Sequence, residues 1–114
     1  MPDNILKERR RFPRYGCSFS VCYSTRGMAS FGNHAIVENV SKVGLCVRIS
    51  RLVKQGNVIK LIIHTENEYN TIRALGMVRW VKEDSPTPSL MVRAGIEFLE
   101  IDPFDVDKLL SIAS

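Results

Sequence analysis

The stretch GLCVRIS, residues 44–50, is the clearest structural signal in this sequence. Its side chains alternate, so that Leu45, Val47 and Ile49 would share one face of an extended strand. Arg48 would lie on the opposite face, toward solvent. This alternation is typical of a β-strand with one face in a core, and it predicts a protein built from antiparallel sheet.

Five other segments carry related patterns, separated by polar, glycine-containing or proline-containing stretches. SFSVCYS alternates, with Phe19, Val21 and Tyr23 on one face, and NHAIVENVS is a weaker strand. Three further segments are rich in β-branched and apolar residues: NVIKLIIH, TIRALGMVRWV and MVRAGIEFL. The polar stretches KQGN and TENEYN predict hairpin loops. Six strands with such turns between them predict an all-β barrel or sandwich.

The C-terminal stretch IDPFDVDKLLSIA has a helical pattern instead. Asp102 suits the N-cap, Pro103 suits the first helical position, and Asp105 places a negative charge in the first turn. A short helix that packs on the sheet is therefore expected, with an apolar stripe formed by Val106, Leu109, Leu110 and Ala113.

The size and composition of the chain predict one globular domain, because its 114 residues are 45% hydrophobic and 25% charged. We expect residues 1–14 to form a flexible basic arm and residues 15–114 to form a barrel domain with the C-terminal helix. No segment approaches the ~20 apolar residues that a membrane span needs. The N-terminus lacks the apolar region of a secretory signal. We therefore expect a cytoplasmic protein without membrane insertion.

The cysteines and histidines give little indication of a metal or catalytic site. Cys17, Cys22 and Cys46 cannot form a closed disulfide set, because their number is odd. His34 and His64 are far apart in sequence and have no Cys-x-x-Cys motif nearby, so buried or incidental thiols are favoured over a metal site. No Ser-His-Asp set, glycine-rich phosphate loop or paired-carboxylate motif is apparent. We expect a protein that is not an enzyme.

Arginine supplies ten of the 16 basic residues, and the net charge is +4. Arginine binds phosphates and the guanine edge through two parallel hydrogen bonds, so its excess suggests an anionic partner. Within KERRRFPRY, Arg10 and Arg14 are four residues apart, which places both on one side of either a helix or an extended chain. The alternative is a solvated basic arm with no ligand.

A second polar motif is ENVSKVG, residues 38–44. Asn39 and Ser41 are two residues apart, so they project from the same face of a strand, and both can donate and accept hydrogen bonds. Gly44 allows positive φ or the close approach of a ligand. The alternative is a plain hairpin, because Asn, Ser and Gly are common turn residues.

Together, RRRFPR and NVSKVG resemble the two ligand motifs of the PilZ domain family, in the same order. The similarity continues through LGMVRWV and AGIEFLEID, which look like the family's late strands. Asn39 stands where many members have Asp. The resemblance implies an all-β fold with a six-stranded antiparallel barrel of the split-barrel type, a short C-terminal helix and a flexible N-terminal arm.

The resemblance also implies a bacterial sensor or adaptor that binds cyclic di-GMP, a second messenger, without any cofactor. Arg10 and Arg14 would grip guanine and phosphate from the arm. Asn39 and Ser41 would hydrogen-bond the other guanine, and Gly44 would keep the barrel wall low. Binding would reorder the arm and signal to an unidentified protein partner.

Two more residues are candidates. Arg9 precedes the first motif, and by resemblance an arginine here would serve a second, stacked ligand, so two cyclic di-GMP molecules per chain are expected. The alternative is a single ligand with Arg9 solvated. Trp80 would either stack on a base or pack at the barrel rim.

A different class of function is a small basic β-barrel that binds single-stranded nucleic acid. We do not favour it, because the predicted strands show no row of exposed aromatic residues.

Overall fold

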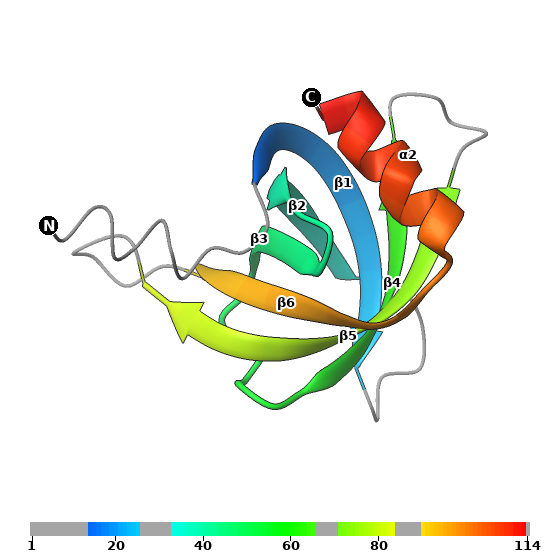
Figure 1. Ribbon diagram of the computed structural model, residues 1–114. Helices are drawn as coiled ribbons and strands as arrows, with labels where there is room; N and C mark the ends of the chain where they lie inside the picture. Colours follow the sequence, from blue (N-terminus) through cyan, green and yellow to red (C-terminus); the bar gives the residue numbers. More distant parts are fainter. Residues whose placement is uncertain (1–13, 26–32, 66–70, 84–89, 114) are drawn as a thin grey trace, which may run out of the picture.

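The computed structural model describes residues 14–25, 33–65, 71–83 and 90–113. Within them the chain forms a closed barrel of six strands followed by one helix (Figure 1). The elements are β1 Tyr15–Thr25, β2 Asn33–Val40, β3 Gly44–Ser50, β4 Val58–His64, β5 Thr71–Lys82, β6 Met91–Ile101 and α2 Pro103–Ala113. The sequence left open a barrel or a sandwich, and the barrel expected from the family resemblance is confirmed. The division into arm and barrel stays a prediction, because residues 1–13 lie outside the described part.

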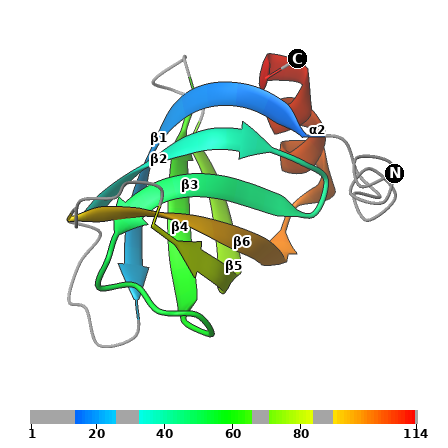
Figure 2. The ribbon, with the colours of Figure 1, turned by 90° about the vertical axis from the view of Figure 1, so that its left-hand side faces the viewer.

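The strands follow one another around the barrel in the order β1-β2-β3-β6-β5-β4, and every neighbouring pair is antiparallel. Figure 2 shows β1, β2, β3 and β6 as successive bands across one side. β3 and β4 are not neighbours, so the predicted hairpin at KQGN is wrong. This connection crosses the end of the barrel instead: Gly56, at φ +91°, donates its N–H to the carbonyl of Val78 at 2.7 Å.

The apolar residues that alternate along the sequence of β1 and β3 are the residues that form the core. Phe19, Val21 and Tyr23 of β1 are buried, and so are the three apolar residues predicted to face inward on β3. Substituting a fully buried residue such as Ile49 by Ala would cost about 2–5 kcal/mol. Cys46 is also buried, although it lies on the opposite face of β3. Alternation did not predict this burial, and Cys46 lines the pocket described below.

The C-terminal helix begins as the sequence predicted. The Asp102 side chain accepts a hydrogen bond from the N–H of Phe104 at 2.9 Å, and its carbonyl accepts one from the N–H of Asp105 at 2.9 Å. Val106 and Leu109 are buried, and the helix contacts β1 and β2 (Figure 1). Among the described residues, no helix is long and apolar enough to cross a membrane.

Candidate ligand-binding site

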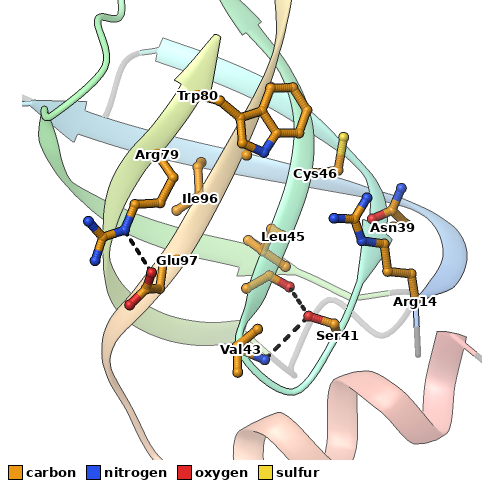
Figure 3. Close-up of a pocket in the computed structure, with 12 residues that line it drawn as sticks. Arg14, Asn39, Ser41, Val43, Leu45, Cys46, Arg79, Trp80, Ile96 and Glu97 are labelled. Atoms are coloured by element: carbon orange, nitrogen blue, oxygen red, sulfur yellow. Dashed lines mark hydrogen bonds and ion pairs between the residues drawn. The ribbon is translucent and has the colours of Figure 1, made fainter. Parts of the chain in front are cut away.

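A pocket of about 180 Å³ lies on the outer face of the barrel, where the β2–β3 turn meets β5 and β6 (Figure 3). It brings together residues from four strands and from the chain just before β1. Its lining consists of Arg14, Asn39, Ser41, Val43, Gly44, Leu45, Cys46, Arg79, Trp80, Gly95, Ile96 and Glu97.

A β-bulge at Glu38 turns the end of β2 toward this pocket. The pairing of β2 with β3 shifts between Val37 and Asn39, so Glu38 is an extra residue on β2. Ala35 and Val37 are buried on the core side, and continued alternation would send Asn39 there too. The extra residue reverses the phase, so that Val40 is buried and Asn39 lines the pocket.

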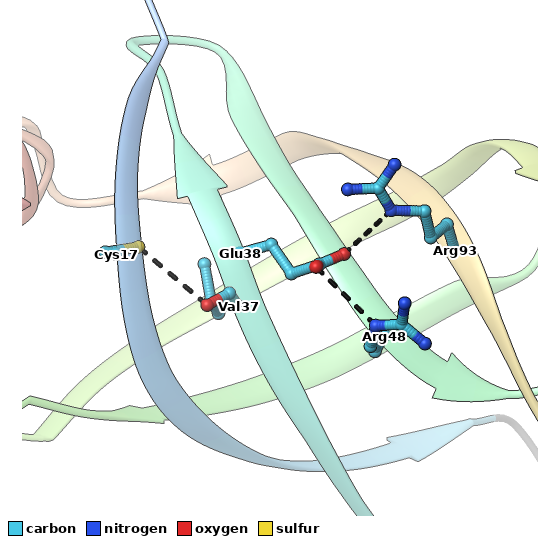
Figure 4. Close-up of polar contacts among 5 residues, drawn as sticks. All are labelled: Cys17, Val37, Glu38, Arg48 and Arg93. Atoms are coloured by element: carbon cyan, nitrogen blue, oxygen red, sulfur yellow. Dashed lines mark hydrogen bonds and ion pairs between the residues drawn. The ribbon is translucent and has the colours of Figure 1, made fainter. Parts of the chain in front are cut away.

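Two arginines hold the bulged residue in place (Figure 4). The Glu38 carboxylate accepts a hydrogen bond from Arg93 Nε of β6 at 2.9 Å. It also forms an ion pair with Arg48 Nε of β3 at 3.5 Å. These contacts tie β2, β3 and β6 together directly beside Asn39, so the bulge is a fixed feature of the pocket wall.

A second bulge, at Arg79, aims Trp80 in the same way. The pairing of β5 with β6 shifts between Val78 and Trp80, so Val78 faces the core opposite Ile96 and Trp80 stands opposite Gly95 on the outer side. A β-carbon on Gly95 would overlap the indole. The missing side chain of Gly95 is therefore what lets the Trp80 ring lie against β6 at the edge of the pocket.

The turn between β2 and β3 forms the floor of the pocket beside these strands. The Ser41 N–H donates to the carbonyl of Gly44 at 2.9 Å, and the Ser41 hydroxyl accepts the N–H of Val43 at 3.3 Å. The hydroxyl thus takes part in the turn while it also lines the pocket. The motif ENVSKVG can therefore form a turn and line a ligand pocket at the same time.

Position 44 requires glycine for a structural reason that the sequence did not reveal. The one described residue with positive φ is Gly56, so left-handed backbone is not what requires glycine at position 44. A β-carbon on Gly44 would overlap the carbonyl of Ile96, because β3 and β6 approach closely there. Gly44 is buried and lines the pocket, so this close contact sets the depth of the floor.

Arg14 and Asn39 lie side by side at one end of the pocket (Figure 3). Arg14 is exposed and directly precedes β1, whereas Asn39 is half-buried beside Cys46, its partner on β3. Burial raises the pKa of the Cys46 thiol, although the cation of Arg93 opposes this shift. Cys46 is thus a neutral part of the wall, while the guanidinium of Arg14 is available to an anion.

Arg79 and Glu97 form an ion pair at the other end (Figure 3). Arg79 Nε donates to Glu97 Oε2 at 2.7 Å, and both side chains are about half exposed. This hydrogen bond lowers the pKa of the Glu97 carboxyl and raises the pKa of Arg79. The contact to Glu97 uses Nε of Arg79, so the two terminal nitrogens of the guanidinium do not take part in this hydrogen bond.

The structure gathers most of the residues singled out in the sequence. Five of them line this one pocket: Arg14, Asn39, Ser41, Gly44 and Trp80. Arg9 and Arg10 lie outside the described residues. The sequence analysis did not single out Arg79 or Glu97, and it did not predict that Gly95 leaves space for the ring of Trp80. The one available signal was the place of Arg79 next to Trp80, and of Gly95 and Glu97 in the last predicted strand.

Comparison with known proteins identifies the family. The model of the PilZ domain matches residues 8–113. The chain belongs to the PilZ domain family. PilZ domains are ligand-binding effector domains and not enzymes, so the expectation of a protein without catalytic activity is confirmed. Comparison with curated proteins gave no significant match.

Solved structures share the fold of this PilZ domain. The inhibitor of motility MotI/DgrA from Bacillus subtilis superposes with a TM-score of 0.70 at 22% identity, over 92% of this chain and 49% of that one. The chain thus spans about half of MotI. The PilZ domain of YcgR from Escherichia coli, solved with c-di-GMP, gives 0.66 at 13% identity, over 92% of this chain and 88% of that chain. YcgR in complex with c-di-GMP gives 0.65 at 14%, over 91% and 44% of the two chains.

Proposed function

We propose that this PilZ domain is a cytoplasmic adaptor that binds cyclic di-GMP in the pocket of Figure 3. The observation that carries the proposal is the meeting of Arg14, Asn39 and Trp80 in one pocket, although they are distant in sequence. The family match and the c-di-GMP complexes of the YcgR neighbours support the same ligand.

The chemistry of the lining suits a ligand with two phosphates and two guanine bases. Arg14 can form two parallel hydrogen bonds to the O6 and N7 atoms of guanine or bind a phosphate. The Asn39 amide can donate to and accept from a second guanine edge. Trp80 offers an apolar face on which a base can stack, and stacking contributes about 1–3 kcal/mol per base. The described lining thus offers contacts to the bases of the ligand, and Arg14 can serve either a base or a phosphate.

The proposal includes a role for the N-terminal residues. Arg9 and Arg10 would close over the bound ligand next to Arg14, and the new surface would be recognised by a protein partner. Two stacked ligands bring four negative charges into the site. Arg14 and Arg79 are the arginines of the described lining, and Arg79 is paired with Glu97. Arg9 would supply part of the missing positive charge.

Titration calorimetry of the full chain with cyclic di-GMP tests the ligand. A parallel titration with a single-stranded oligonucleotide, across a salt series, tests the nucleic-acid alternative. We expect saturable binding of cyclic di-GMP and no tight binding of the oligonucleotide at physiological salt. Oligonucleotide binding that is tight at low salt and falls steeply with salt, with no heat from cyclic di-GMP, would overturn the proposal.

A further inference from the structure

A second cluster of reactive side chains lies on the outer wall of the barrel, outside the pocket. Cys22 sits near the middle of β1, between β2 and β4. Its Sγ atom is 3.5 Å from His34 Nδ1 on one side and 3.4 Å from His64 Nε2 on the other. None of the three residues lines the ligand-binding pocket. The fold has therefore placed both histidines of the chain around one thiol.

The register explains this arrangement. Cys22 stands directly opposite His34 on β2, and His64 on β4 is paired with Ser20, two residues before Cys22. Side chains directly opposite and diagonal across antiparallel strands are close enough to interact. Because β2 and β4 flank β1, the imidazoles reach the sulfur from opposite sides. Among the described residues, no group of metal-ligating side chains is arranged to hold a metal ion.

Cys22 differs from the other two cysteines in its surroundings. Cys17 packs against the core and Cys46 is buried, and burial raises the pKa of both thiols. Cys17 and Cys22 are both partly buried, but the partner of Cys17 is the carbonyl of Val37, whereas Cys22 lies beside two imidazoles. A neutral imidazole within hydrogen-bond reach can accept a thiol proton, which is how cysteine nucleophiles are activated.

The described residues nearest to the cluster do not oppose this activation. The nearest register positions on the outer faces of β2 and β4 hold Ile36, Ile62 and Lys60 besides the histidines. None of these is acidic, and the ammonium of Lys60 favours a negative charge on sulfur. Arg73, opposite Ile62 on β5, adds another cation to this face.

We propose that Cys22 is a modification site, where the thiol reacts with peroxides or with soft electrophiles while His34 or His64 accepts its proton. With hydrogen peroxide, the sulfur attacks one oxygen and the O–O bond breaks. The thiol proton passes through the imidazole to the departing hydroxide. The products are a cysteine sulfenic acid and water, so the reaction balances without another reagent.

Alkylation of the native full chain with iodoacetamide, followed by mass mapping of each cysteine, tests the proposal. Cys22 should react at least about tenfold faster than Cys17 or Cys46. This is below the ~10²–10⁴ typical of a positioned base, because the contacts to sulfur are long.

The variants His34→Asn and His64→Gln separate an activated thiol from one that is merely accessible. Circular dichroism checks that each variant keeps the barrel. The double variant should lower the Cys22 rate towards that of a free thiol, and trapping of the sulfenic acid with dimedone after peroxide should fall in parallel. Equal rates at all three cysteines, or an unchanged Cys22 rate in the folded double variant, would overturn the proposal.

Discussion

The indole of Trp80 on β5 occupies the space that a β-carbon on Gly95 of β6 would need. The two residues face each other at a bulge in the β5–β6 pairing, at the edge of the ligand-binding pocket. Trp80 is the one tryptophan of the chain, so its position is open to a direct optical measurement.

Gly95→Ala should displace the Trp80 ring from β6. Insertion of a methyl group into a packed contact costs about 1–3 kcal/mol, and the displaced ring should no longer stack on a base. We expect a shift in the fluorescence of Trp80 and weaker binding of cyclic di-GMP. Gly16→Ala is the control for fluorescence and stability, because nothing lies within 4 Å of a β-carbon there. A spectrum identical to that of the wild type would show that the ring does not depend on Gly95.

Gly44→Ala should destabilise the fold itself, since its β-carbon would meet the backbone carbonyl of Ile96, which cannot rotate away. A loss of about 1–3 kcal/mol is expected, or roughly 4 °C of thermal midpoint per kcal/mol for a domain of this size. Thermal unfolding without ligand measures it. An unchanged midpoint would mean that β3 and β6 can separate at this point at no cost.

Glu97→Gln should strengthen ligand binding, and Arg79→Ala should weaken it. Removing the carboxylate frees the Arg79 guanidinium for a phosphate and removes a negative charge from the pocket. We expect changes of a few-fold in Kd, largest at low salt because exposed charges are screened. Equal affinities of both variants and the wild type at low salt would place Arg79 outside the binding site.

The same pair predicts a pH dependence of stability. The pKa of the Glu97 carboxyl is lowered by Arg79, so the pair adds stability at pH values above the ordinary value of 4.5. This contribution is lost as the pH falls through the lower pKa of the folded state. The thermal midpoint of the wild type should therefore exceed that of Glu97→Gln slightly at pH 7, and the difference should vanish in acid. A difference that grows in acid would have the wrong sign.

Arg9→Leu should reduce the number of bound ligands from two to one while the first ligand still binds tightly. Two stacked molecules carry four negative charges, and Arg9 would help to balance those of the second. Calorimetry with excess cyclic di-GMP gives the stoichiometry directly. An endpoint of one ligand per wild-type chain would contradict the prediction.

The sequence predicted the inward faces of the strands well, because a strand with one face in the core alternates apolar and polar residues. Phe19, Val21 and Tyr23 were placed correctly for this reason. The spacing of Asn39 and Ser41 predicted a shared face, and both residues line the pocket. The sequence did not reveal why that face lies outside the core. The reason is the bulge at Glu38, which depends on how β2 pairs with β3.

Features that arise between strands distant in sequence were also out of reach. The contact of Gly44 with Ile96, and that of Trp80 with Gly95, exist only because β6 lies between β3 and β5. The KQGN turn was predicted as a hairpin for the same reason, since its residues suit a turn whether or not the flanking strands pair.

Calorimetric titration of Arg14→Ala with cyclic di-GMP, beside the wild type and Arg73→Ala, is the most direct test of ligand binding in this pocket. Both arginines are exposed, but Arg14 lines the binding pocket and Arg73 does not. Loss of a charge-assisted contact of Arg14 should cost about 2–3 kcal/mol, or roughly 30- to 150-fold in affinity. We expect this loss for a folded Arg14→Ala and wild-type affinity for Arg73→Ala. Equal affinities of the two variants, or no binding to the wild type, would contradict it.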